Sequence, residues 1–103
     1  MRVAIVSTDG KTVNEHFGRA DRFLIYDLTP EGVKFLEERG SEPLSVGDPK
    51  HPFDREHFEE VAYAIGDCER VYATKIGVRP AEELEKKGIK PVLYKGPIAH
   101  IPN

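Results

Sequence analysis

The chain has 103 residues and a mass of 11.6 kDa, a length that suits one compact domain and excludes two domains of ordinary size. Its formal net charge is −3 and it has no run of arginines, so we expect no nucleic-acid partner. One cysteine excludes an internal disulfide, and no apolar run reaches the roughly 20 residues that a membrane helix needs. We therefore expect a cytoplasmic protein without a membrane-spanning segment.

The first half of the sequence predicts three strands. Residues 2–7 form an apolar, β-branched run, which is typical of a central strand covered on both faces. Residues 22–28 predict a second strand, and the turn sequence at residues 29–32 joins it to a third strand over residues 33–39. The charged side chains of this third strand are typical of a protected sheet edge.

A long loop and a helix follow the third strand. Residues 40–52 contain several glycines and prolines and show little periodicity, so we expect a loop with a functional role. Asp54 is suited to cap a helix, and Gly66 is suited to end it. Apolar residues recur with the helical period between them, at Phe58, Val61, Ala62 and Ile65.

The remaining sequence predicts a strand, a second helix and a final strand. Residues 70–74 are the fourth strand, and Pro80 suits the first turn of a helix that Gly88 ends. Two charged pairs at i, i+4 spacing support this helix, Glu82 with Lys86 and Glu83 with Lys87. Residues 89–94 form the last strand, which its proline places at an edge.

This order of elements predicts an α/β fold in a single domain over residues 1–103, with one mixed five-stranded sheet. Right-handed crossovers through the two helices connect parallel strands, whereas the hairpin makes the second strand antiparallel to its neighbours. The first, third, fourth and fifth strands therefore point the same way. Their carboxyl ends share one edge of the sheet, which is where open α/β sheets bind ligands.

Three loops are expected to meet at this carboxyl edge. Residues 8–18 contain His16, residues 41–52 contain His51, and residues 75–79 lead into a helix. Imidazole is a common metal ligand and a proton carrier near neutral pH, but a loop histidine can also be a surface residue or form hydrogen bonds within its loop. The same alternatives apply to the other histidines, whose spacings do not match a zinc site: His51, His57 and His100.

The segment before Pro80 has the chemistry of an anion site. Lys75 and Arg79 supply positive charge, Gly77 supplies flexibility, and the start of a helix supplies unpaired amides. In the alternative interpretation, Gly77 turns the chain and the two cations face water.

The cysteine and the carboxylates argue against other chemistry. Cys68 lies between the first helix and the fourth strand, at the amino edge opposite His16, so we expect a structural role for it. Asp9 and Asp27 are expected at opposite edges of the sheet. They should not converge on a pair of metal ions, as two-metal phosphoryl chemistry requires.

Residues 1–28 and 65–92 resemble the dinitrogenase iron-molybdenum cofactor biosynthesis family, and the most specific segment is Val-Asn-Glu-His-Phe-Gly at residues 13–18. The resemblance implies a ribonuclease-H-like three-layer sandwich and a role as carrier of an iron-sulfur or iron-molybdenum type cluster. It also implies that His16 is the cluster ligand. A protein that donates or accepts the cluster would be the partner.

The leading hypothesis is a non-enzymatic carrier that holds an anionic metal cluster at the carboxyl edge and delivers it to a partner. His16 would be the metal ligand, with Lys75, Gly77 and Arg79 binding the cofactor through its charge. One alternative is a metal-dependent phosphodiesterase-like enzyme on a ribonuclease-H-like scaffold. Another is a metal-free regulatory or interaction domain whose loop at residues 40–52 contacts a partner.

Overall fold

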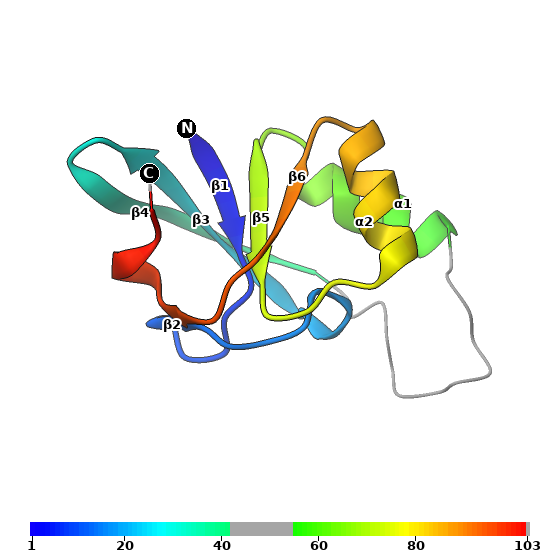
Figure 1. Cartoon of the computed structure of the whole chain (residues 1–103). Coiled ribbons are helices and arrows are strands. Elements are labelled where there is room, and N and C mark those ends of the chain that lie inside the picture. The colour runs from blue at the N-terminus through cyan, green and yellow to red at the C-terminus, as the bar shows by residue number, and fades with distance from the viewer. Residues whose placement is uncertain (42–54, 103) are drawn as a thin grey trace.

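Five strands form the main sheet of the computed structural model, which describes residues 1–41 and 55–102 (Figure 1). Their order across the sheet is β4 (Gly32–Gly40), β3 (Arg22–Thr29), β1 (Arg2–Ile5), β5 (Arg70–Ala73) and β6 (Lys90–Leu93). β3 is antiparallel to β1 and β4, whereas β1, β5 and β6 are parallel. The predicted mixed sheet, with β1 in its centre and β4 and β6 at its edges, is confirmed.

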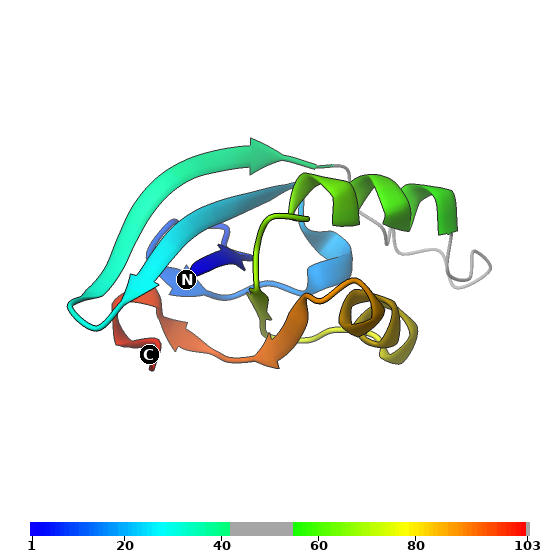
Figure 2. The ribbon, with the colours of Figure 1, turned by 90° about the horizontal axis from the view of Figure 1, so that it is seen from above.

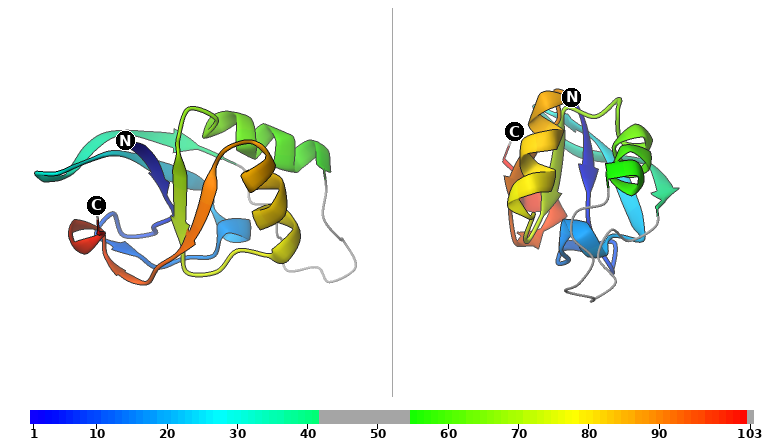
Figure 3. Two further views of the ribbon diagram at one scale, coloured as in Figure 1. Left: turned by 45° about the horizontal axis from the view of Figure 1, so that its top comes forward. Right: turned by 90° about the vertical axis from the view of Figure 1, so that its right-hand side faces the viewer.

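Both helices pack on the same face of this sheet, as Figures 2 and 3 show. α1 (Arg55–Ala64) connects β4 to β5, and α2 (Val78–Lys86) connects β5 to β6. Both connections move in the same direction across the sheet, so right-handed crossovers place both helices on one side. No helix among residues 1–41 and 55–102 is long and apolar enough to span a membrane.

The second face of the sheet is covered by a small ribbon and a 3₁₀ turn. The ribbon pairs β2 (Thr12–Val13) with β7 (Gly96–Pro97), and the turn η2 (Ile98–His100) follows it. The three layers are therefore helices, sheet, and ribbon with 3₁₀ turn. The ribonuclease-H-like assignment stays a prediction.

β1 lies between two apolar clusters. Ala4 and Val6 face the helices, where they join the predicted helical residues Phe58, Val61, Ala62 and Ile65. Val3 and Ile5 face the ribbon and pack with Ile98 and Ile101 of the C-terminal segment. Because the side chains of a strand alternate, burial on both faces requires the unbroken apolar run that the sequence shows.

The observed ends of the helices match the predicted ends only in part. α2 ends at Lys86, and Gly88 follows with φ +81°, a conformation that suits glycine after a helix. α2 begins at Val78, however, so Arg79 lies in its first turn and not in the loop before it. Asp54, the expected cap of α1, and most of the loop at residues 40–52 lie outside the described residues.

The charged residues of α2 connect the two helices. Glu83, expected to pair with Lys87, instead lies 3.2 Å from the guanidinium of Arg55 on α1. Lys87 contacts Glu59 of α1 at 2.6 Å, and Lys86 lies 3.4 Å from Glu83. The predicted i, i+4 pair of Glu83 with Lys87 is therefore wrong, because the neighbouring helix offers nearer partners.

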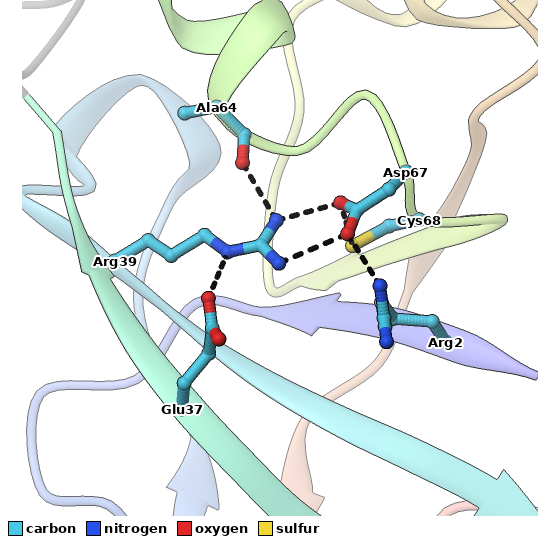
Figure 4. Close-up of polar contacts among 6 residues, drawn as sticks. All are labelled: Arg2, Glu37, Arg39, Ala64, Asp67 and Cys68. Carbon is cyan, nitrogen blue, oxygen red and sulfur yellow. Dashed lines mark hydrogen bonds and ion pairs between the residues drawn. The ribbon is translucent and has the colours of Figure 1, made fainter.

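An ion-pair network surrounds Asp67, in the connection between α1 and β5 (Figure 4). Arg39 of β4 donates two hydrogen bonds to the Asp67 carboxylate, of 2.6 and 2.9 Å, and a third to the Ala64 carbonyl at the end of α1. Arg2 of β1 donates to the same carboxylate at 2.7 Å. These hydrogen bonds hold the pKa of Asp67 well below its usual range. The network joins β1, β4 and the end of α1.

Replacement of Asp67 by asparagine should lower the free energy of unfolding at neutral pH by about 1 kcal/mol, since the ion pairs are partly exposed to water. The lowered pKa means that this contribution is present above roughly pH 4 and is lost as the pH falls toward the folded-state value. Urea unfolding of wild type and Asp67→Asn across acidic and neutral pH measures the difference. Glu69→Gln, in the same connection, is the control, and an equal loss in both variants would contradict the assignment.

Candidate functional site

The loop after β1 is folded around the carboxylate of Asp9. Its Oδ1 accepts the backbone N–H groups of Lys11 and Thr12, both at 2.8 Å, and the hydroxyl of the buried Ser7 at 3.1 Å. These hydrogen bonds hold the pKa of Asp9 well below its usual range. Asp9 is therefore a turn-forming residue, and its acceptor sites are used by the loop itself.

Asn14 closes this loop onto its own beginning. Its side-chain oxygen accepts the Thr8 N–H at 2.8 Å, and its amide nitrogen donates to the Thr8 hydroxyl, also at 2.8 Å. The neighbouring Val13 is buried and pairs with Gly96 in the β2–β7 ribbon. The chain that leads to His16 is thus held by the Asn14 hydrogen bonds to Thr8 and by the pairing of Val13 with Gly96.

Two backbone hydrogen bonds join the His16 segment to the end of β5. The Thr74 N–H donates to the Glu15 carbonyl at 3.0 Å, and the Phe17 N–H donates to the Lys75 carbonyl at 2.9 Å. His16 and Lys75 form an isolated parallel bridge between them. The two loops expected at the carboxyl edge therefore lie side by side there.

Glu15 and Phe17 stabilise the loop through their side chains, whereas the imidazole of His16 does not. The Glu15 carboxylate accepts the His16 backbone N–H at 2.8 Å, and Phe17 is buried in the core as the first residue of the 3₁₀ turn η1 (Phe17–Arg19). The His16 ring is half-buried and forms no hydrogen bond or ion pair with any residue in the described parts of the chain. Within these residues, neither ring nitrogen has a partner.

The loop between β5 and α2 places cations and amides beside His16. Lys75 and Arg79 are exposed, and Gly77 directly precedes α2. The backbone amide of Val78 begins the helix, where an amide has no acceptor in a preceding helical turn. A Cβ on Gly77 would lie 3.3 Å from the Pro80 ring, so a larger residue would crowd the first turn.

The other candidate residues lie elsewhere. His51 is outside the described residues, His57 lies on α1, and His100 is exposed in η2. Asp27 is at the amino edge, where it accepts a hydrogen bond from the Met1 ammonium group at 3.1 Å. Within residues 1–41 and 55–102, no three histidine, cysteine or acidic side chains are arranged to hold a metal ion.

Cys68 lies at the amino edge, as expected, and is buried in the helix-side core. Burial, followed by the negative charge of the neighbouring Asp67, raises the pKa of its thiol to about 12. Figure 4 shows the sulfur behind the Asp67 carboxylate. A buried thiol at the edge opposite His16 suits a packing role.

Sequence reasoning missed the residues that hold the site in place. Asn14 and Glu15 act through hydrogen bonds to nearby backbone or side-chain groups, and the ribbon partner of Val13 lies far away in the sequence. The only local signal was the turn chemistry of Thr8, Asp9 and Gly10, which indicates a tight loop but not its closure by Asn14.

The sequence matches the family described as dinitrogenase iron-molybdenum cofactor over residues 1–101. The chain belongs to this family. Azotobacter vinelandii NifB, an FeMo cofactor biosynthesis protein, is 34% identical over 86% of this chain and 18% of NifB. Protein NifX from Sinorhizobium fredii is 30% identical over 96% of this chain and 62% of NifX. The chain thus spans less than a fifth of this NifB and less than two thirds of this NifX.

Solved structures of similar proteins share the fold. The crystal structure of PH0822 is 29% identical with a TM-score of 0.67, and the match covers 96% of this chain and 84% of PH0822. The NMR structure of TM1290 from Thermotoga is 25% identical with a TM-score of 0.58, and it covers 95% of this chain and 79% of TM1290. These matches agree with the α/β architecture described above.

Cys68→Ala should lower the free energy of unfolding by about 1 kcal/mol, because it removes only a small buried group. Since its pKa is raised to about 12, the thiol should also resist alkylation in the folded protein. Mass spectrometry after iodoacetamide treatment, with and without denaturant, measures this reactivity. Rapid alkylation of the folded chain would contradict the structural role.

Proposed function

We propose that this protein is a non-enzymatic carrier that holds an iron-sulfur or iron-molybdenum type cluster at the carboxyl edge and delivers it to another protein. The observation that carries the proposal is the imidazole of His16, which has no partner among the described residues and lies beside Lys75 in a hydrogen-bonded frame. Membership of the dinitrogenase iron-molybdenum cofactor family supports this kind of cargo.

His16 would bind one metal of the cluster through a neutral ring nitrogen. A cluster of this kind is anionic, and the ammonium of Lys75, the guanidinium of Arg79 and the amides at the start of α2 would offset its charge. The frame of backbone hydrogen bonds reduces the ordering that binding has to impose on this loop.

A single protein ligand suits a carrier more than a permanent site. Structural metal centres use three or four protein ligands, which hold the metal tightly, whereas one imidazole lets the cargo leave with the loss of one bond. The exposed position of Lys75 next to His16 leaves the cluster open to a partner on the outer side. The carrier role therefore accounts for both capture and release.

The two alternatives have less support. A phosphodiesterase would need carboxylates that converge on metal ions, but Asp9 is used by its own turn and Asp27 pairs with Met1 at the other edge. A metal-free interaction domain would give no role to the available imidazole of His16. Anaerobic purification followed by metal and sulfide analysis separates this second alternative from the carrier.

His16→Ala should abolish or sharply weaken cluster binding, because it removes the proposed metal ligand without touching the core. The measurement is anaerobic reconstitution followed by absorbance and metal content. His100→Ala is the matched control, since His100 is an exposed histidine in η2. If His16→Ala binds the cluster as tightly as wild type while His100→Ala behaves normally, the site is wrong, and His51 becomes the next ligand to test.

Replacement of both Lys75 and Arg79 by alanine should weaken cluster binding and reduce its dependence on salt. The reason is that exposed charges are screened over about 10 Å at 0.1 M salt, so the contribution of these cations should fall as salt rises. Titration of the cluster at low and high salt compares the double variant with wild type. An identical salt dependence would show that these cations do not contribute.

A further inference from the structure

Basic side chains gather at the carboxyl edge of an otherwise acidic chain. Residues 8–20, 74–80 and 94–97 contain five cations and two carboxylates, a net charge of +3, whereas the whole chain carries −3. The cations are Lys11, Arg19, Lys75, Arg79 and Lys95. A local charge of opposite sign to the whole chain is a feature that can orient a charged partner.

The chain of all three segments runs along the lower side of Figure 1. The β2–β7 ribbon pairs Val13 with Gly96, so Lys95 lies close to the chain that leads to His16. The bridge between His16 and Lys75 joins the loop after β1 to the loop before α2.

Most cations of this surface are exposed to solvent and have no carboxylate partner among the described residues. Lys11, Arg19, Lys75 and Lys95 are exposed and form no ion pair with any residue of the described chain. The two carboxylates in the same segments, those of Asp9 and Glu15, accept hydrogen bonds from backbone amides of their own loop. In other segments of the described chain, six cations are ion-paired, namely Arg2, Arg22, Arg39, Arg55, Lys86 and Lys87, whereas Lys34, Arg70 and Lys90 are not. Arg22 borders this surface, because it donates a hydrogen bond to the Thr8 carbonyl at 2.9 Å.

Two exposed aliphatic side chains accompany these charges. Val78, the first residue of α2, is 76% exposed, and Leu93, the last residue of β6, is 67% exposed. Leu93 pairs with Ala73, the last residue of β5, so both aliphatic residues belong to the carboxyl edge. Apolar residues bordered by charged ones are typical of a protein–protein interface.

The same edge is poorly suited to nucleic acid. Proteins that bind single strands stack bases on exposed aromatic rings. The aromatic residues of these three segments are occupied, because Phe17 is buried and Tyr94 packs edge-on against Tyr72 and donates its hydroxyl to the Pro97 carbonyl. An acidic protein surface therefore fits better than a phosphate backbone.

We propose that the carboxyl edge is a docking surface for an acidic, partly apolar face of the protein that receives the cargo. The identity of that partner as a cluster acceptor rests on the proposed carrier function, whereas the docking chemistry does not. Lys11, Arg19 and Lys95 attract the acidic face, and Val78 and Leu93 contact its apolar residues. Docking here brings the acceptor against His16, so that encounter and transfer occur on one surface.

The test uses the cluster-free full chain and a fluorescent helical peptide of about 20 residues with glutamate on one face and leucine on the other, in the manner of a helix bound to a groove. Fluorescence anisotropy gives its affinity, and amide chemical shifts locate it. We expect shifts in residues 8–20, 74–80 and 94–97. Lys11→Glu with Lys95→Glu should weaken binding at least about tenfold, because like charges then face each other.

Lys34→Glu with Lys90→Glu is the matched control. It makes the same change in net charge at two exposed lysines outside the carboxyl edge, neither of which is ion-paired within the described chain, and it should leave peptide affinity nearly unchanged. An equal loss in both double variants would overturn the docking surface, because only net charge would then matter. Shifts confined to other faces, or tighter binding of a single-stranded oligonucleotide than of the peptide, would also overturn it.

A further variant separates this inference from the carrier role. Cluster-free His16→Ala should bind the peptide like wild type, because the ring of His16 does not belong to the docking charges. Lys11→Glu with Lys95→Glu should still load the cluster in anaerobic reconstitution. If wild type fails to load a cluster but binds the peptide at this edge, the carrier role is wrong and the docking surface stands. If wild type loads a cluster but does not bind the peptide, the docking surface is wrong and the carrier role stands.

Discussion

The candidate site depends on the backbone pairing between the chain after β1 and the chain after β5. These strands are parallel neighbours in the sheet, and the hydrogen bonds of Thr74 with Glu15 and of Phe17 with Lys75 connect the chain beyond both strands. Since backbone groups make this connection, the side chains of His16 and Lys75 are not consumed by it. The fold can therefore hold both residues in fixed positions and still present them to a ligand.

Carboxylates have different partners in two parts of the molecule: Asp67 binds arginine side chains, whereas Asp9 and Glu15 bind backbone amides. In the connection between α1 and β5, Asp67 is bound by Arg2 from β1 and by Arg39 from β4, and the thiol of Cys68 is buried. At the carboxyl edge, the carboxylates of Asp9 and Glu15 fold their own loop and leave the nearby cations exposed. Ion pairs thus surround Asp67, whereas Lys11, Arg19 and Lys75 form none with the described residues.

Membership of the iron-molybdenum cofactor family and the geometry of the carboxyl edge support the same kind of function by independent arguments. The family description concerns a metal cofactor, and the edge combines an available imidazole with positive charge and helix amides. A carrier needs a site that is formed in advance, has few ligands and is open on one side. These are properties of an exposed loop held by a rigid scaffold, as here.

The sequence alone determined the local elements and the edge at which the candidate residues lie. The apolar run of β1, the helical period of α1 and the hairpin turn each have a signal within a few residues, and strand direction then assigns His16 and Lys75 to the same edge. Tertiary structure decided the rest. Two-residue strands such as β2 and β7 have no detectable period, Glu83 pairs across to another helix, and the register of His16 with Lys75 is set by hydrogen bonds between distant segments. Such contacts depend on how the elements pack, which a local pattern does not specify.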